Sequence, residues 1–147
     1  MDVAYVAARK GLQIKIVKMP EKYKDVAGFL DVESKTIYVN NEDPANRQTF
    51  TIAHELGHFV LKHDPGQVGV LLRLPVPGDQ KTAIEKEADV FAANLLVPKK
   101  MLLQTMKEYD LTSDQVDILA RIFAVSRMTM MYRFKWLGLE KYGNYRW

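Results

Sequence analysis

Two histidines and a glutamate, His54, Glu55 and His58, have a spacing that suits metal chemistry. They lie in an apolar run, residues 50–61, whose one formally charged residue is Glu55. If this run is helical, His54 and His58 lie one turn apart on the same face, where two imidazoles can bind one tetrahedral metal ion. Glu55 is about 100° around the helix from His54, so it can act on a water molecule in the site without being a ligand. The spacing predicts a zinc hydrolase.

The predicted helix belongs in the core, because its apolar residues cover nearly all of its sides. Buried histidines and a buried carboxylate need partners, since an unpaired buried charge is costly. Gly57 in mid-helix costs about 1 kcal/mol relative to alanine, which indicates that another group approaches closely there. The competing interpretation is a chance match formed by ordinary buried histidines.

A third ligand must come from another part of the chain. His63 does not fit, because the metzincin pattern has its third histidine six residues after the second, and His63 follows His58 by only five. Glu85 is the better candidate, because it lies in a second strong helical pattern, residues 84–96, and shares a face with Asp89. Glu85 can bind zinc while Asp89 accepts the Nδ1 proton of a ligating histidine and fixes its tautomer.

A plainer interpretation of this second helix is a charged outer face that includes Glu85, Glu87 and Asp89. The apolar residues around them place Glu85 and Asp89 near the edge of the buried stripe, which favours the ligand interpretation. Glu87 points away by about 160° relative to Asp89, and we expect it to be solvated.

The two helical segments together resemble the ImmA/IrrE-type metallopeptidases. The matching residues are His54-Glu55-Leu56-Gly57-His58 and Glu85-x-Glu87-Ala88-Asp89-x-Phe91-Ala92-Ala93-x-Leu95-Leu96-Val97-Pro98. The resemblance implies a thermolysin-like, gluzincin-type zinc endopeptidase with His54, His58 and Glu85 as ligands and Glu55 as catalytic base. It also implies a narrow substrate, namely a helix-turn-helix repressor of a phage, a mobile element or a stress response, so that the enzyme is an anti-repressor.

Peptide hydrolysis also needs a hydrogen-bond donor for the tetrahedral oxyanion. Tyr132, Arg133 and His63 are the candidate donors, and the sequence places none of them.

The composition suits one compact domain, residues 1–147, in which 1–98 form the zinc-binding core and 99–147 a C-terminal helical segment. The chain has no cysteine, which excludes disulfides and a cysteine zinc site and indicates a reducing compartment. No signal peptide or transmembrane span is apparent. We therefore expect a cytoplasmic protein that does not interact with a membrane.

The remaining segments predict an α+β fold. Residues 12–17 alternate between apolar and polar side chains, and 26–32 and 36–40 give two more strands. Together they should form a small antiparallel sheet that packs on the zinc-binding helix pair. Residues 64–80 form either an edge strand or flap or a hydrophobic loop. This stretch, or the strand at 36–40, is our candidate for binding extended substrate by strand addition.

The C-terminal segment supports a second class of function. Leu119-Ala120 and Val125-Ser126 have the spacing of a helix-turn-helix, although Ala124 replaces the glycine that usually eases the turn. Residues 99–147 carry nine lysines and arginines against five acidic residues, a net charge of +4.

The alternative to a peptidase is therefore a DNA-binding or protein-binding transcriptional regulator with a structural or catalytically silent zinc site. Such a regulator would present Arg127, Thr129 and Arg133 to DNA. The segment that carries these residues is largely apolar, which suits packing against protein better than binding in a major groove. We therefore favour the peptidase, whose partner is a protein substrate.

Overall fold

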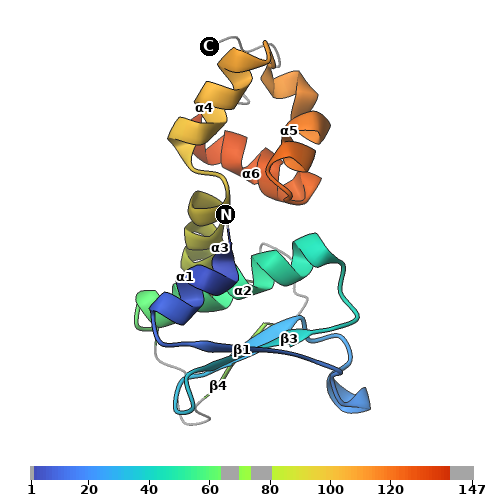
Figure 1. Ribbon diagram of the computed structural model, residues 1–147, viewed down its shortest axis with the longest axis vertical. Helices are drawn as coiled ribbons and strands as arrows, with labels where there is room; N and C mark the ends of the chain where they lie inside the picture. Colours follow the sequence, from blue (N-terminus) through green and yellow to red (C-terminus); the bar gives the residue numbers. More distant parts are fainter. Residues whose placement is uncertain (1, 64–69, 74–80, 140–147) are drawn as a thin grey trace. The chain divides into compact units, whose positions relative to one another are not determined.

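The computed structural model describes residues 2–63, 70–73 and 81–139. Its elements (Figure 1) are α1 Val3–Arg9, β1 Gln13–Val17, the 3-10 helix η1 Glu21–Tyr23, β2 Gly28–Asp31, β3 Thr36–Asn40, α2 Ala45–Val60, β4 Val70–Arg73, α3 Ala83–Leu96, α4 Lys99–Glu108, the 3-10 helix η4 Ser113–Gln115, α5 Val116–Ile122 and α6 Arg127–Leu137. The chain divides into two compact units, Met1–Ala92 and Ala93–Trp147. The division falls within α3, a few residues before the boundary expected after residue 98.

The first unit contains a four-stranded sheet in the order β1-β3-β2-β4. β2 pairs antiparallel with both β3 and β4, whereas β1 pairs parallel with β3. The α+β class is confirmed, but the sheet is mixed and not wholly antiparallel. β2 and β3 form an antiparallel hairpin, and β3 lies between β2 and β1. β1 pairs with β3 and not with the next strand along the chain, β2, and it runs in the same direction as β3.

Helices α1 and α2 lie over one face of this sheet (Figure 1). Leu30 of β2 and Ile37 and Val39 of β3 are fully buried, and α2 packs on these two strands. Gly28 permits the close approach, because a Cβ atom there would stand 2.5 Å from Thr51 Cγ2 and from the Tyr38 carbonyl oxygen. The sheet therefore fixes the position of α2.

The sheet order bears on where an extended peptide can add. β3 is paired on both sides, by β1 and β2, so the expectation that residues 36–40 bind substrate as a free edge is wrong. β4 forms an outer strand of the sheet as described. The rest of the 64–80 stretch lies outside the described residues.

The second unit is helical and matches the helix-turn-helix-like segment expected from the sequence. Its core consists of the buried side chains of Leu102, Met106, Val116, Leu119, Ala120, Val125, Met130 and Phe134. The turn between α5 and α6 contains Ala124 in the left-handed conformation, with φ 54°, and Ser126 caps α6 by accepting the Thr129 N–H at 3.0 Å. Among the described residues, no helix combines the length and apolarity needed to cross a membrane.

Candidate metal centre

Helix α2 holds the two histidines in the protein interior. His54 and His58 are each only 1% exposed, and their Nε2 atoms face one another at 3.1 Å. The rings are near perpendicular, at 82°. The one-turn spacing has therefore brought two imidazole nitrogens to the same point, as predicted from the sequence.

Helix α3 approaches α2 closely at Gly57. A Cβ atom on Gly57 would stand 3.0 Å from Cδ1 and 3.2 Å from Cβ of Phe91. The glycine that is costly in a helix thus makes room for the aromatic ring of the second helix. This contact explains why a glycine is found in the middle of a buried helix.

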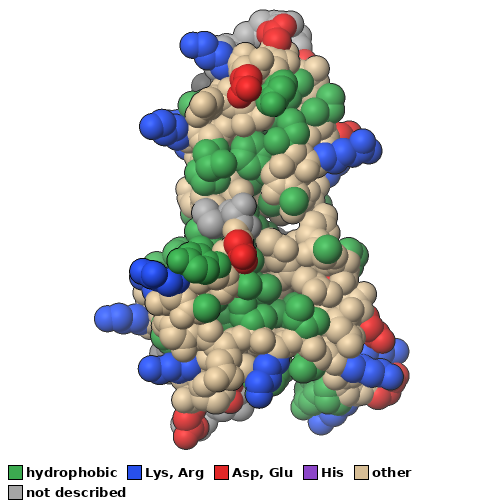
Figure 2. Space-filling model, in the orientation of Figure 1, with side chains coloured by type: hydrophobic (Ala, Val, Ile, Leu, Met, Phe, Trp, Pro, Cys, Tyr) green, Lys and Arg blue, Asp and Glu red, His purple; other side chains and the backbone are tan. Residues whose placement is uncertain are grey.

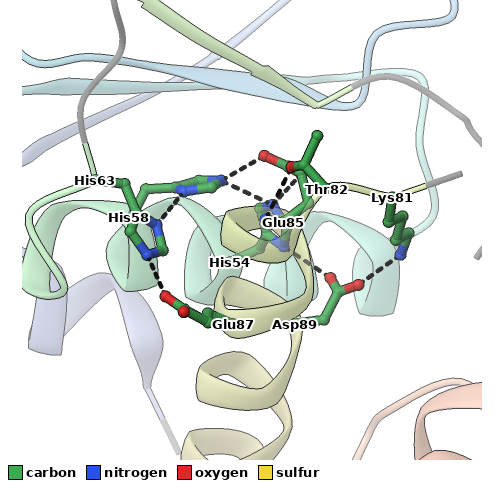
Figure 3. A network of polar contacts seen from close by, with 8 residues as sticks. All are labelled: His54, His58, His63, Lys81, Thr82, Glu85, Glu87 and Asp89. Atoms are coloured by element: carbon green, nitrogen blue, oxygen red, sulfur yellow. Dashed lines mark hydrogen bonds and ion pairs between the residues drawn. The ribbon is translucent and has the colours of Figure 1, made fainter.

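Glu85 in the first turn of α3 completes a cluster of three donor groups (Figure 3). Its Oε2 is 3.0 Å from His54 Nε2 and its Oε1 is 2.9 Å from His58 Nε2. The ligand atoms of the three residues all lie within 4.8 Å of one another, so the group can hold a metal ion. In a tetrahedral site with bonds of about 2.0–2.1 Å, neighbouring donors are roughly 3.3 Å apart, close to the spacings seen here.

Asp89 determines which nitrogen of His54 faces the cluster. Its Oδ1 is 2.8 Å from His54 Nδ1, and its Oδ2 contacts Lys81 Nζ. An ionised carboxylate only accepts hydrogen bonds, so His54 donates its Nδ1–H and the neutral ring keeps a lone pair on Nε2. A lone pair and a carboxylate aimed at one point are the donor set that a cation requires, so the residues fit a metal ion.

The two carboxylates are held ionised by their neighbours. Burial raises the pKa of Glu85, but contacts with protonated His54 and His58 outweigh this effect, so without a metal ion its pKa lies well below the usual value. A bound cation would take the place of the protons on the two Nε2 atoms and would likewise favour the ionised carboxylate. Burial likewise raises the pKa of Asp89, and hydrogen bonds from His54 and Lys81 bring its pKa below the usual value. Both groups are therefore negatively charged at neutral pH.

His63 and Glu87 form a second set of contacts next to the cluster. His63 Nδ1 is 2.8 Å from His58 Nδ1, and His63 Nε2 is 2.8 Å from Glu87 Oε2. The sequence correctly suggested that Glu87 is solvated, since its side chain is 60% exposed, but it did not predict the contact with His63. Lys81 was also missed, because nothing in its sequence context links it to Asp89.

The other candidate residues lie in different settings. Glu55 is fully buried on α2 and is not one of the three clustered donors. Tyr132 and Arg133 belong to the second unit. Tyr132 is 43% exposed and stacks on Trp136 at 5.8 Å. Arg133 is 4% exposed and donates from Nε to the Val97 carbonyl at 2.8 Å, and its burial lowers its pKa.

The burial of Arg133 corrects one expectation. This residue cannot present its guanidinium on an exposed helix face, as the DNA-binding alternative required. Arg127 pairs with Asp117 at 2.7 Å, so its charge is partly balanced. On the face shown in Figure 2, basic side chains around the C-terminal helices are scattered, with hydrophobic side chains between them.

The fold and the cluster define a class of protein: an α+β metal-binding domain in which a His-Glu-x-x-His helix and a glutamate helix share one site. The sequence profile of the IrrE N-terminal-like domain matches residues 8–135. The chain belongs to this family of metallopeptidase domains.

Individual relatives agree with this assignment. The chain is 28% identical over 142 residues to the radiation response metalloprotease IrrE of Deinococcus radiodurans, a match that covers 90% of this chain and 43% of the relative. It is 31% identical over 120 residues to IrrE of Deinococcus deserti, which covers 81% of this chain and 42% of the relative. The chain thus spans less than half the length of the curated relatives it matches.

A solved structure shares the fold. A Mycobacterium tuberculosis transcriptional regulator superimposes with a TM-score of 0.64 at 19% identity, over 90% of this chain and 39% of that one. At this identity the likeness supports the α+β fold and nothing about function.

Proposed function

We propose that this chain is a zinc-dependent endopeptidase domain of the gluzincin type, with His54, His58 and Glu85 as the metal ligands and Glu55 as the catalytic base. The observation that carries the proposal is the convergence of three donor groups from α2 and α3, with Glu55 following His54 directly in the buried helix. Membership of the metallopeptidase family and the likeness to two metalloproteases support it.

Zinc is the metal that this donor set favours. Two imidazole nitrogens and one carboxylate form the ligand set of several catalytic zinc sites, whereas calcium and magnesium prefer oxygen ligands. Two neutral histidines and one carboxylate leave a net charge of +1 on the site. Three protein ligands also leave room for water or substrate.

The proposed mechanism assigns the proton transfers to Glu55. Zinc held by His54, His58 and Glu85 would lower the pKa of water and polarise the substrate carbonyl. Glu55 takes a proton from the attacking water and returns it to the leaving amine, as a general base and then a general acid. Asp89 keeps His54 in the tautomer that faces the site.

The proposed substrate is a helix-turn-helix repressor, as the family resemblance implies. Two relatives are described as radiation response metalloproteases, which supports a stress-response repressor among the options. An extended substrate segment can add to β4, because this strand is an outer strand of the sheet.

The test of this proposal is the variant Glu55→Gln, which preserves shape but removes the base. We expect the wild-type protein, co-expressed with candidate repressors such as the product of a neighbouring gene, to cleave one of them. Glu55→Gln should bind the same repressor without cleaving it, because binding does not use the base. The matched control is Glu33→Gln, which changes the charge equally on an exposed turn and should cleave normally. Cleavage by Glu55→Gln at the wild-type rate would disprove the assignment.

The alternative, a DNA-binding regulator, makes a different prediction. Such a protein should be indifferent to Glu55→Gln and should lose salt-sensitive DNA binding when Arg127 is changed to alanine. We expect weak DNA binding by the wild type and by Arg127→Ala at both low and high salt. Regulation that survives Glu55→Gln but not Arg127→Ala would assign the function to the C-terminal helices.

A further inference from the structure

His63 is held against His58 by the way in which α2 ends. The His63 N–H donates to the His58 carbonyl at 3.0 Å, and the Lys62 N–H donates to the Phe59 carbonyl at 3.2 Å. Lys62 adopts the left-handed conformation, with φ 58°, so these bonds form a Schellman motif. The motif turns the chain back toward the last turn of the helix, and the His63 side chain is only 7% exposed.

The two contacts of the His63 ring fix the direction of a proton chain (Figure 3). Glu87 carries a carboxylate that only accepts, so His63 donates from Nε2 across the 2.8 Å contact. The neutral ring then has a lone pair on Nδ1, which can only accept from His58 Nδ1–H at 2.8 Å. His58 is left with a lone pair on Nε2, which lies beside Glu85 at 2.9 Å.

The series of hydrogen bonds from His58 through His63 to Glu87 resembles the arrangement at His54. Asp89 accepts directly from His54 Nδ1, whereas Glu87 acts on His58 through the intervening His63. Both histidines therefore have an acceptor on the side away from the cluster, Asp89 for His54 and His63 for His58. The carboxylate at the outer end of each set of contacts, Asp89 or Glu87, lies on α3.

We propose that His63 and Glu87 are positioning residues that fix the tautomer and the ring orientation of His58 for metal binding. The inference rests on the proposed metal site and adds to it a pair of residues that are neither ligands nor catalytic groups. His63 is not a ligand here, because its Nδ1 is occupied by His58 and its Nε2 by Glu87.

Three substitutions of His63 separate hydrogen bonding from packing. His63→Ala removes ring and acceptor, and His63→Phe keeps a ring of similar size without nitrogen. His63→Asn keeps an amide oxygen near the position of Nδ1, so it can still accept from His58. We expect zinc affinity, measured by competition with a chromophoric chelator, to fall about 10-fold or more in His63→Ala and His63→Phe and to stay close to wild type in His63→Asn.

Glu87→Ala removes the carboxylate that accepts from His63. The Glu87 side chain is exposed, so we expect the variant to fold normally. We expect a smaller loss of zinc affinity than for His63→Ala, because water can replace the exposed carboxylate. The matched control is Glu33→Ala, which removes the same charge from an exposed turn and should bind zinc as the wild type does.

Nitrogen-15 NMR of the histidine rings gives a readout that does not depend on affinity. In the zinc-loaded wild type we expect His58 to carry its proton on Nδ1, in slow exchange with solvent, and in His63→Ala we expect that exchange to be fast. A wild-type His58 Nδ1 proton that exchanges as fast as an imidazole proton open to solvent would overturn the proposal, even if no variant of His63 folds.

Two affinity results would also overturn it: His63→Phe that binds zinc as tightly as the wild type, or His63→Asn that binds as weakly as His63→Ala. The first would show that the ring only fills space, and the second that an acceptor for the His58 Nδ1–H does not support zinc binding. Failure of the metal site itself is a separate result, because the wild type would then bind no zinc before any variant is compared.

Discussion

At the scale of single residues, the site depends on which atom of each side chain carries a proton. Two imidazole lone pairs and a carboxylate oxygen that face one another repel unless a cation lies among them. Asp89 and the His63–Glu87 pair lie on the outer sides of the two rings. The buried polar groups are thus arranged around a positive charge, which explains how two histidines and a glutamate are accommodated in an apolar core.

The first prediction concerns metal content. The purified protein should contain about one zinc per chain, and His54→Ala, His58→Ala or Glu85→Ala should lose most of it, because three ligands are the minimum for a tight site. Elemental analysis after dialysis measures this directly. Glu87→Ala is the control and should retain the metal at stoichiometric protein concentration. Zinc retained in Glu85→Ala but lost in Glu87→Ala would show that the wrong glutamate was chosen.

Much of the cluster follows from spacing alone. His54 and His58 share a face because they are four residues apart, and Glu85 and Asp89 share one for the same reason. The contacts of Lys81 and His63 could not be predicted in this way. Lys81 precedes α3 and reaches Asp89 through folding, and His63 depends on a left-handed Lys62, a conformation that lysine seldom adopts.

At the scale of elements, the distance between α2 and α3 decides whether the donors meet. Gly57 allows the short distance between the two helices, because it leaves room for Phe91 of α3 against α2. Glu85 and Asp89 lie on the same helix as Phe91, so a shift of α3 moves both carboxylates relative to the histidines.

The second prediction is that Gly57→Ala weakens zinc binding. The added methyl group gains about 1 kcal/mol of helix propensity, but crowding a packed core costs about 1–3 kcal/mol, and the Phe91 atoms concerned include Cβ, which moves only with the backbone. We expect a net loss of stability of about 1 kcal/mol, measured by denaturant unfolding, and lower zinc affinity. Adding Phe91→Leu should restore part of both. Unchanged affinity in Gly57→Ala would show that the glycine is not needed for the helix approach.

The third prediction concerns the turn between α5 and α6. Ala124 occupies the same left-handed position after its helix that Gly138 occupies after α6, with φ 54° and 71°. A left-handed conformation costs an alanine about 1 kcal/mol, and glycine avoids this cost. Part of the resulting gain in stability is lost, because glycine has more conformational freedom in the unfolded chain. We expect Ala124→Gly to raise the free energy of unfolding by about 0.5 kcal/mol or more.

The reciprocal change, Gly138→Ala, is the control. A Cβ atom there meets nothing within 4 Å, so its effect is purely conformational, and with the same offset it should lower stability by about 0.5 kcal/mol or more. Calorimetric melting of both variants measures the two effects. A loss of stability in Ala124→Gly would mean that packing of the alanine methyl group outweighs its backbone strain.

The strands were easier to predict than their pairing. The expected strands at 12–17, 26–32 and 36–40 correspond closely to β1, β2 and β3, because alternation of apolar side chains is a local property. Pairing is not local. The parallel contact of β1 with β3 joins residues more than twenty positions apart, and no turn signal between neighbouring strands reveals it.

At the scale of the whole molecule, the chain joins a sheet-containing unit that carries the candidate site to a helical unit with a net positive charge. The family assignment extends over both, since the matched residues run from 8 to 135. The proposed metal ligands nevertheless all lie in Met1–Ala92. Metal binding should therefore stabilise that unit in particular, because its ligands come from two separate helices.

The last prediction is that zinc raises the melting temperature. Binding to the native state alone adds about 2.7 kcal/mol when free zinc is 100 times its dissociation constant. For a chain of this size each kcal/mol raises the melting temperature by about 2–4 °C, so we expect a rise of about 5–10 °C between chelator-treated and zinc-loaded protein in calorimetry. His58→Ala should show almost no rise, and calcium should not replace zinc in the wild type, because imidazole nitrogen is a poor ligand for it. An equal rise in His58→Ala would mean that zinc stabilises the protein from a site other than the one formed by α2 and α3.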